Sequence, residues 1–102
     1  GFDWPDLGGV FDKIEEELAE LRHASEHESR ERQQDELGDL LFAVVNASRF
    51  LKVDPEEALA VTNREFAQRF RYIEEQLRIS GRTFGDTSLS EMESWWQEAK
   101  NR

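Results

Sequence analysis

The sequence predicts an all-α protein built as an antiparallel helical bundle. Only two prolines and few β-branched residues occur in 102 positions, which disfavours strands. Apolar residues recur every three or four positions in several stretches, which is the spacing of one helix face. Short links separate these stretches, and short links favour antiparallel neighbours in a bundle.

The first helix is expected from about Val10 to Ser25, after an ordered, non-helical lead-in from Gly1 to Gly9. Its apolar positions fall at helical spacing and predict a core stripe: Val10, Ile14, Leu18 and Leu21. A polar link around residues 27–29 then leads into a second helix, expected from about Arg30 to Leu51. Residues 40–45 of that helix are apolar on every side, which predicts burial. Gly38 precedes this strip, and its cost within a helix suggests that something approaches the backbone closely there.

The third helix has a strong start signal at residues 54–57. Asp54 is a favoured N-cap, Pro55 suits the first helical position, and Glu56 and Glu57 are favourable in the first turn. The helix is expected to run to about Ser80, where Gly81 ends it. A short fourth helix is expected after residue 88, because Ser88 and Glu91 have the spacing of a capping box.

Composition narrows the class of protein. The formal net charge of −10 disfavours nucleic-acid binding, which depends on clustered Lys and Arg. The absence of Cys excludes disulfides and thiolate metal sites and fits a cytoplasmic location, and no apolar run approaches the ~20 residues of a membrane span. The length fits one domain, residues 1–102, and the opening on Gly1 is consistent with one domain of a longer protein.

Four carboxylates form the candidate metal site. Glu17 and Glu20 share a face of the first helix, and Glu36 and Asp39 share a face of the second. Acidic residues are common here, 23 of 102, so a solvated acidic face is the competing interpretation. Both pairs nevertheless adjoin apolar stripes on consecutive helices, where they would converge as an all-oxygen site for a hard cation such as Mg²⁺. A di-iron site is disfavoured because it needs two Glu-x-x-His motifs, and only residues 20–23 supply one.

The residues Glu16-Glu17-x-x-Glu20 and Glu36-x-x-Asp39 resemble the EExxE…ExxD signature of MazG-type nucleoside triphosphate pyrophosphohydrolases. The similarity covers nearly the whole chain. It includes Lys13 and four further segments, at residues 1–5, 38–46, 63–70 and 92–96. The resemblance implies the all-α NTP pyrophosphatase fold, completed by a homodimer or higher homo-oligomer.

The same resemblance implies hydrolysis of a nucleoside triphosphate between its α and β phosphates, to the monophosphate and pyrophosphate, in house-cleaning of the nucleotide pool. It makes Glu17, Glu20, Glu36 and Asp39 the ligands of Mg²⁺, with Mn²⁺ as a substitute. Glu16 is a candidate for activating water or for a supporting role, and a solvated glutamate is the alternative.

Basic, aromatic and amide residues are the substrate-binding candidates. Lys13 and Arg32 lie four positions before Glu17 and Glu36, so each shares a face with a proposed ligand. This spacing favours a substrate-binding or charge-balancing role, although a simple salt bridge competes for Arg32. Arg69 matches a family arginine that contacts the nucleotide. Trp96 matches a family tryptophan near the nucleotide and could stack on a base, with core packing as the alternative. Asn46 and Asn63 are candidates for base or sugar contacts, or for hydrogen bonds within the bundle.

One position departs from the family pattern. Glu65 stands where the family has a lysine, four residues before Arg69. This difference favours an alternative function, in which a non-catalytic oligomerisation or regulatory module has retained the scaffold. The intact set of four carboxylates favours the enzyme, and the preferred base is not readable from the sequence.

Overall fold

The computed structural model describes all 102 residues and contains helices without any β-strand. The elements are α1 (Leu7–His27), α2 (Arg30–Leu51), α3 (Pro55–Ser80), a short 3₁₀ helix η1 (Phe84–Asp86) and α4 (Leu89–Lys100). The predicted all-α class is therefore confirmed. The chain divides into two compact units, Gly1–Pro55 and Glu56–Arg102, which are described separately.

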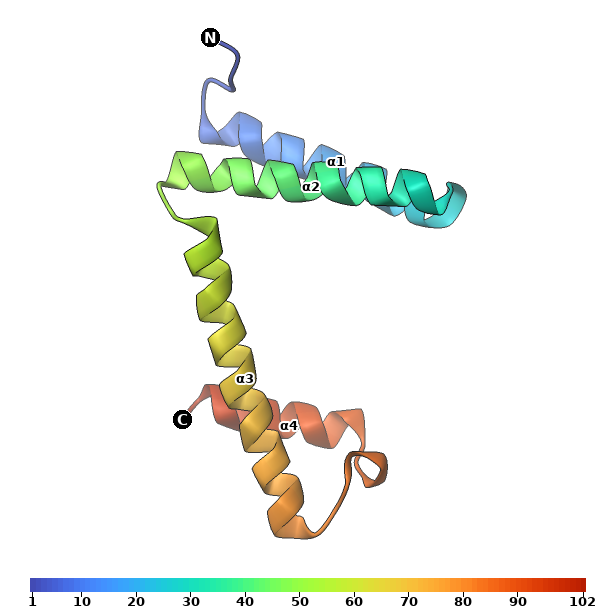
Figure 1. The fold of residues 1–102 in the computed structure, drawn as a ribbon, viewed down its shortest axis with the longest axis vertical. Helices are drawn as coiled ribbons and strands as arrows, with labels where there is room; N and C mark the ends of the chain where they lie inside the picture. The colour runs from blue at the N-terminus through green and yellow to red at the C-terminus, as the bar shows by residue number, and fades with distance from the viewer. The chain divides into compact units, whose positions relative to one another are not determined.

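The first unit is an antiparallel pair formed by α1 and α2 (Figure 1). Helix α1 begins at Leu7, three residues before the predicted start, so residues 7–9 are helical rather than part of the lead-in. The cause is Asp6, whose side chain accepts a hydrogen bond from the Gly9 amide at 2.9 Å and so caps the helix. Helix α2 has its predicted bounds and is capped by Ser29, which accepts a hydrogen bond from the Arg32 amide.

The turn between these helices is held by one side chain. Gln33 Nε2 donates to the carbonyl oxygens of Ala24, at 3.0 Å, and Glu28, at 3.3 Å. Both acceptors lie at the end of α1, where the Ala24 carbonyl also accepts a hydrogen bond from the Glu28 amide at 3.0 Å. The two-residue link and this clamp fix how α2 folds back along α1.

Small residues line the seam between α1 and α2. The buried apolar positions of the unit are Val10, Ala24, Ala43 and Ala47. Such small side chains let two helices approach closely, but they cover little surface. The prediction that residues 40–45 are buried on every side is accordingly wrong within this chain, since Leu41, Phe42, Val44 and Val45 are exposed. Open space also surrounds Gly38, contrary to the expected close approach.

The second unit is organised around larger side chains. Ile73 and Leu77 on α3 are buried, and α4 packs across the middle of α3 (Figure 1). Ring contacts connect the elements: Phe66 with Trp96, and Phe70 with Phe84, at centroid separations of 5.3 and 5.5 Å. Helix α3 ends at Ser80, and the next residue, Gly81, adopts a positive φ of 68°, as predicted for a glycine that terminates a helix.

Helix α4 starts where the capping signal placed it. Ser88 Oγ accepts a hydrogen bond from the Glu91 amide at 3.1 Å. The Tyr72 hydroxyl of α3 donates to Glu98 of α4 at 2.7 Å and joins the two helices through a polar contact. None of the helices in the chain combines the length and the apolar character needed to cross a membrane.

Candidate metal and active site

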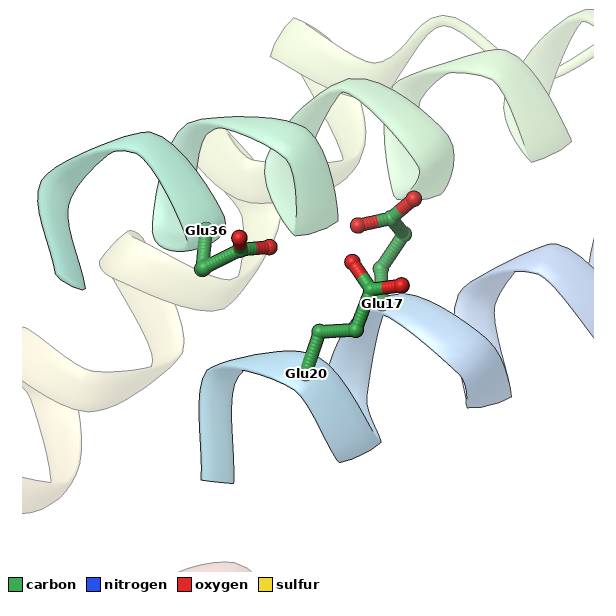
Figure 2. A group of neighbouring side chains, drawn as sticks. All are labelled: Glu17, Glu20 and Glu36. Carbon is green, nitrogen blue, oxygen red and sulfur yellow. The ribbon is translucent and has the colours of Figure 1, made fainter. Parts of the chain in front are cut away.

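Three of the four predicted metal ligands meet between α1 and α2. Figure 2 shows Glu17 and Glu20 of α1 directed toward Glu36 of α2. Each of the three offers a carboxylate oxygen, and these oxygens all lie within 4.8 Å of one another. The i, i+3 spacing puts Glu17 and Glu20 on one face of α1, and the antiparallel return of α2 brings Glu36 opposite them.

Two members of this cluster are buried. The side chains of Glu17 and Glu36 are only 8% and 7% exposed, while Glu20 is exposed. Oxygen Oε2 of Glu17 and Oε2 of Glu36 are both buried without a hydrogen-bond partner. Burying an ionised carboxylate is costly unless it is paired or coordinates a metal. These two oxygens are therefore suited to bind a metal ion, because the protein supplies no partner for them.

The other oxygen of each buried glutamate is paired with a cation on its own helix. Lys13 Nζ lies 3.0 Å from Glu17 Oε1, and Arg32 Nη2 lies 2.7 Å from Glu36 Oε1. Lys13 also lies 3.4 Å from Oε2 of the exposed Glu16. Both cations therefore contact proposed metal ligands in this structure, as the i, i+4 spacing predicted.

The charges in the cluster shift the pKa values of two side chains, Glu20 and Lys13. The negative charge of Glu17 raises the pKa of Glu20 above its ordinary value, and partial burial and Glu36 act in the same direction. The hydrogen bond with Glu17 raises the pKa of Lys13, which opposes its partial desolvation. Three oxygen donors under mutual repulsion are a suitable environment for a hard divalent cation such as Mg²⁺.

Asp39 and Glu16 lie outside the converging group. Asp39 follows Glu36 by one turn but is exposed, and its carboxylate is not among the oxygens that approach one another. The helix spacing that puts Asp39 on the side of Glu36 does not set the distance to α1, which depends on how the helices cross. Glu16 is exposed and contacts Lys13. The proposed roles of both residues stay predictions.

A hollow of about 390 Å³ adjoins the cluster. Its lining includes Glu20, Glu36, Arg32 and His23. The sequence alone did not predict this hollow, because its lining residues come from both helices and become neighbours only when the helices pack. The His23 ring contacts the His27 ring in a tilted arrangement, with ring centroids 4.7 Å apart, and His23 is not a member of the carboxylate group.

At the other end of the helix pair, Asn46 is buried and belongs to a chain of polar contacts. Arg49 Nη1 donates to Asn46 Oδ1, and Arg49 Nη2 lies 2.7 Å from Asp3 Oδ2. The amide nitrogen Nδ2 of Asn46 has no partner. Asp3 was not predicted to take part, because its partner Arg49 lies 46 positions away in the sequence. This contact ties the N-terminal segment to the end of α2.

The second unit contains the remaining substrate candidates. The Arg69 guanidinium lies over the Trp96 ring, 5.3 Å from its centroid, and the expected contact of both residues with a nucleotide stays a prediction. Glu65 pairs with Arg69 at 3.5 Å, so the residue that replaces the family lysine partly neutralises this arginine. Both lie at the edge of a hollow of about 440 Å³ that Tyr72 also lines. Asn63 is exposed on α3.

Comparison with known proteins identifies the family of the chain. The pattern of the phosphoribosyl-ATP pyrophosphohydrolase family matches residues 4–66, which include both helices of the carboxylate cluster. A MazG nucleoside triphosphate pyrophosphohydrolase/pyrophosphatase of Thermotoga maritima is 45% identical over 100 residues, covering 98% of this chain and 38% of that protein.

Two further relatives extend the comparison. A nucleoside triphosphate pyrophosphohydrolase of Escherichia coli is 38% identical over 104 residues, covering all of this chain and 40% of that protein. The uncharacterized protein YabN of Bacillus subtilis is 52% identical over 65 residues, covering 64% of this chain and 13% of YabN. The chain thus spans about two fifths of the length of the named pyrophosphohydrolases. It belongs to the phosphoribosyl-ATP pyrophosphohydrolase family, and it is similar to the MazG protein of Thermotoga maritima.

Proposed function

We propose that this chain is a catalytic domain that hydrolyses nucleoside triphosphates between the α and β phosphates, with Mg²⁺ as cofactor. The observation that carries the proposal is the pair of buried, unpartnered carboxylate oxygens of Glu17 and Glu36 beside Glu20. The names of the family and of two relatives all specify pyrophosphohydrolysis, which supports the same reaction.

The charge of the substrate explains why a cation is required. A triphosphate carries several negative charges and is repelled by a carboxylate cluster. Bound Mg²⁺ would supply positive charge beside the phosphoryl oxygens and lower the pKa of a water molecule. Glu17, Glu20 and Glu36 would hold that ion, and Asp39, one turn beyond Glu36, is the proposed fourth ligand. The attacking water loses a proton and its oxygen forms a bond to the α phosphorus, while the bond from that phosphorus to the bridging oxygen breaks and pyrophosphate leaves with that oxygen.

Other residues of the chain are assigned to the nucleotide. Arg69 and Trp96 are the proposed nucleotide contacts, because a guanidinium over an indole ring offers both charge and a stacking surface. Asn46, with its free amide donor, and Asn63 are proposed to contact base or sugar. Glu16 is proposed to help activate water, since Lys13 holds it beside Glu17.

The decisive experiment measures pyrophosphate release from a panel of ribo- and deoxynucleoside triphosphates, with Mg²⁺, with Mn²⁺ and with EDTA. Glu36→Gln tests the cluster, and Glu31→Gln is the matched control, since it makes the same change at an exposed position of α2. We expect metal-dependent release of monophosphate and pyrophosphate, lost in Glu36→Gln and kept in Glu31→Gln. Release of orthophosphate would show that a different bond is cleaved.

A non-catalytic oligomerisation or regulatory module remains the second candidate. The contact between Glu65 and Arg69 favours it, because it weakens the charge available for a phosphate tail. Absence of turnover with every nucleotide, in a protein that is helical by circular dichroism, would support this candidate over the enzyme.

We also infer that residues 1–102 act as one domain that assembles into a homodimer or higher homo-oligomer. The exposed apolar side chains of α2, among them Leu41 and Phe42, support this inference. Light scattering coupled to size exclusion should give at least twice the chain mass. Phe42→Glu should lower that mass, whereas Leu89→Glu, at an exposed position of α4, should not. A wild-type monomer at micromolar concentration would contradict the inference.

A further inference from the structure

The two buried glutamates of the cluster have the same pattern of partners. In each, Oε1 contacts a cation one helical turn earlier, and Oε2 has no partner. Lys13 forms an ion pair with Glu17 on α1, and Arg32 forms an ion pair with Glu36 on α2. Because the helices are antiparallel, the two cations reach the cluster from opposite ends. Each buried carboxylate thus keeps one oxygen neutralised and one available.

The cations differ from the glutamates in their access to water. The side chains of Lys13 and Arg32 are 35% and 55% exposed, so each remains partly hydrated while its carboxylate partner is buried. Each cation also forms ion pairs with other acidic side chains. Glu16 lies near Lys13, and Glu28 and Asp35 lie 3.8 and 3.6 Å from Arg32. Exposed ion pairs contribute little in water, so the contacts with the buried glutamates dominate.

Charge balance shows what these contacts do. The three converged carboxylates face two cations, which leaves these five groups with about one net negative charge. With Asp39, the proposed fourth ligand, the charge is about −2, so one divalent ion brings the group to about neutral and a second would make it net positive. A bound triphosphate offsets that positive charge, since it brings several negative charges.

We propose that Lys13 and Arg32 are built-in counter-ions, meaning fixed cations that neutralise Glu17 and Glu36 until a metal binds. They keep the metal-free cluster folded and make metal binding weak in the absence of nucleotide. Metal and nucleotide therefore bind with positive coupling, each raising the affinity for the other. This inference rests on the proposed function and assigns Lys13 and Arg32 a role in positioning and regulating the metal site, beyond any contact with phosphate.

The test is a measurement of Mn²⁺ binding by electron paramagnetic resonance at pH 8. It is made first without nucleotide and then with a non-hydrolysable α,β-imido triphosphate. Lys13→Met and Arg32→Met remove one charge each with similar chain length, and Lys13→Arg and Arg32→Lys keep the charge. Arg22→Met removes an exposed charge of α1 that contacts none of the clustered carboxylates.

We expect the two neutral variants to bind Mn²⁺ on the order of tenfold more tightly without nucleotide, because a unit charge close to the ion has been removed. The enhancement of Mn²⁺ affinity by nucleotide should fall by a similar factor. The charge-keeping variants should resemble the wild type, and Arg22→Met should change the affinity much less. Neutral variants that are folded yet bind Mn²⁺ no more tightly than the wild type would overturn the inference.

A second measurement applies if a neutral variant does not fold in the absence of metal. If Lys13→Met or Arg32→Met is unfolded without metal, Mn²⁺ should restore its helical circular dichroism, since the ion replaces the missing counter-ion. Failure of Mn²⁺ to restore the helices would count against the inference.

The same data separate the inference from the proposed function. If the wild type binds no Mn²⁺ with or without nucleotide, the metal site itself is refuted. If the wild type binds Mn²⁺ and Glu36→Gln does not, the metal site stands. Weak binding in the neutral variants would then refute only the counter-ion role.

Discussion

In the α1–α2 pair, the buried positions combine small apolar residues with Glu17, Glu36 and Asn46, whereas in the α3–α4 unit they hold Ile73 and Leu77 beneath contacts between aromatic rings. The first interior contains charges and an unpartnered amide, which oppose folding. The second contains branched aliphatic side chains, which favour it. Buried groups that weaken a fold tend to mark functional sites, and here Glu17 and Glu36 belong to the carboxylate cluster, whereas Asn46 lies at the other end of the helix pair.

The largest expected effect concerns the aliphatic interior. Ile73→Ala should lower the free energy of unfolding by about 2–5 kcal/mol, because it removes buried methyl groups and leaves a cavity. Ile79→Ala is the matched control on the same helix, since Ile79 is exposed, and it should stay within about 0.5 kcal/mol. Denaturant melts of both variants measure the difference. Equal effects would show that α3 does not bury the face that the structure assigns.

Substitution of a buried carboxylate should have the opposite pattern of effects, with a large loss of activity and a small change in stability. Glu17→Gln should reduce pyrophosphate release by more than about a hundredfold, because even the supporting partners of metal ligands are worth 10–100-fold. Its free energy of unfolding without metal should change by less than about 1 kcal/mol, since a repulsion with Glu20 is lost and Lys13 keeps Glu16 as a partner. A strongly destabilised Glu17→Gln would mean that Glu17 acts mainly as a structural residue.

A substitution beside Arg69 tests whether the second unit contributes positive charge to nucleotide binding. Glu65→Lys removes the carboxylate 3.5 Å from Arg69 and introduces the lysine of the family pattern. We expect KM for the nucleotide to fall about threefold with little change in kcat, since steering and ground-state binding improve. Glu74→Lys makes the same charge change elsewhere on α3 and should leave KM nearly unchanged. An unchanged KM in Glu65→Lys would separate this region from the substrate.

The smallest expected effect is a dependence of stability on pH. The pKa of Glu20 is raised in the folded protein by the charge of Glu17, so ionising Glu20 costs more folded than unfolded. This group's stabilising contribution is therefore full below its unfolded pKa and is lost as pH rises through its folded pKa. Glu20→Gln, in EDTA, should melt slightly higher than the wild type at pH 7 and should lose that advantage near pH 4. A variant that is less stable than the wild type at pH 7 would refute the repulsion.

Much of the local structure was predictable from the sequence. The bounds of α2 and α3 follow from capping residues and prolines, which act through contacts within a few positions. The early start of α1 was missed because the cap at Asp6 was not recognised among the aromatic and glycine residues around it. The pairing of Lys13 with Glu17 and of Arg32 with Glu36 also follows from spacing within one helix.

The tertiary structure decided which of these residues meet. Periodicity states that Glu36 and Asp39 share a side of α2, but only the crossing of α1 and α2 brings Glu36 to Glu17 and leaves Asp39 outside the group. The same crossing, over small residues such as Ala43, buries the seam and leaves Phe42 exposed. Helix spacing is a property of one segment, whereas convergence and burial depend on the surface that a second segment covers. The sequence by itself therefore determined the helices and the chemistry they offer, and packing decided which carboxylates form a site.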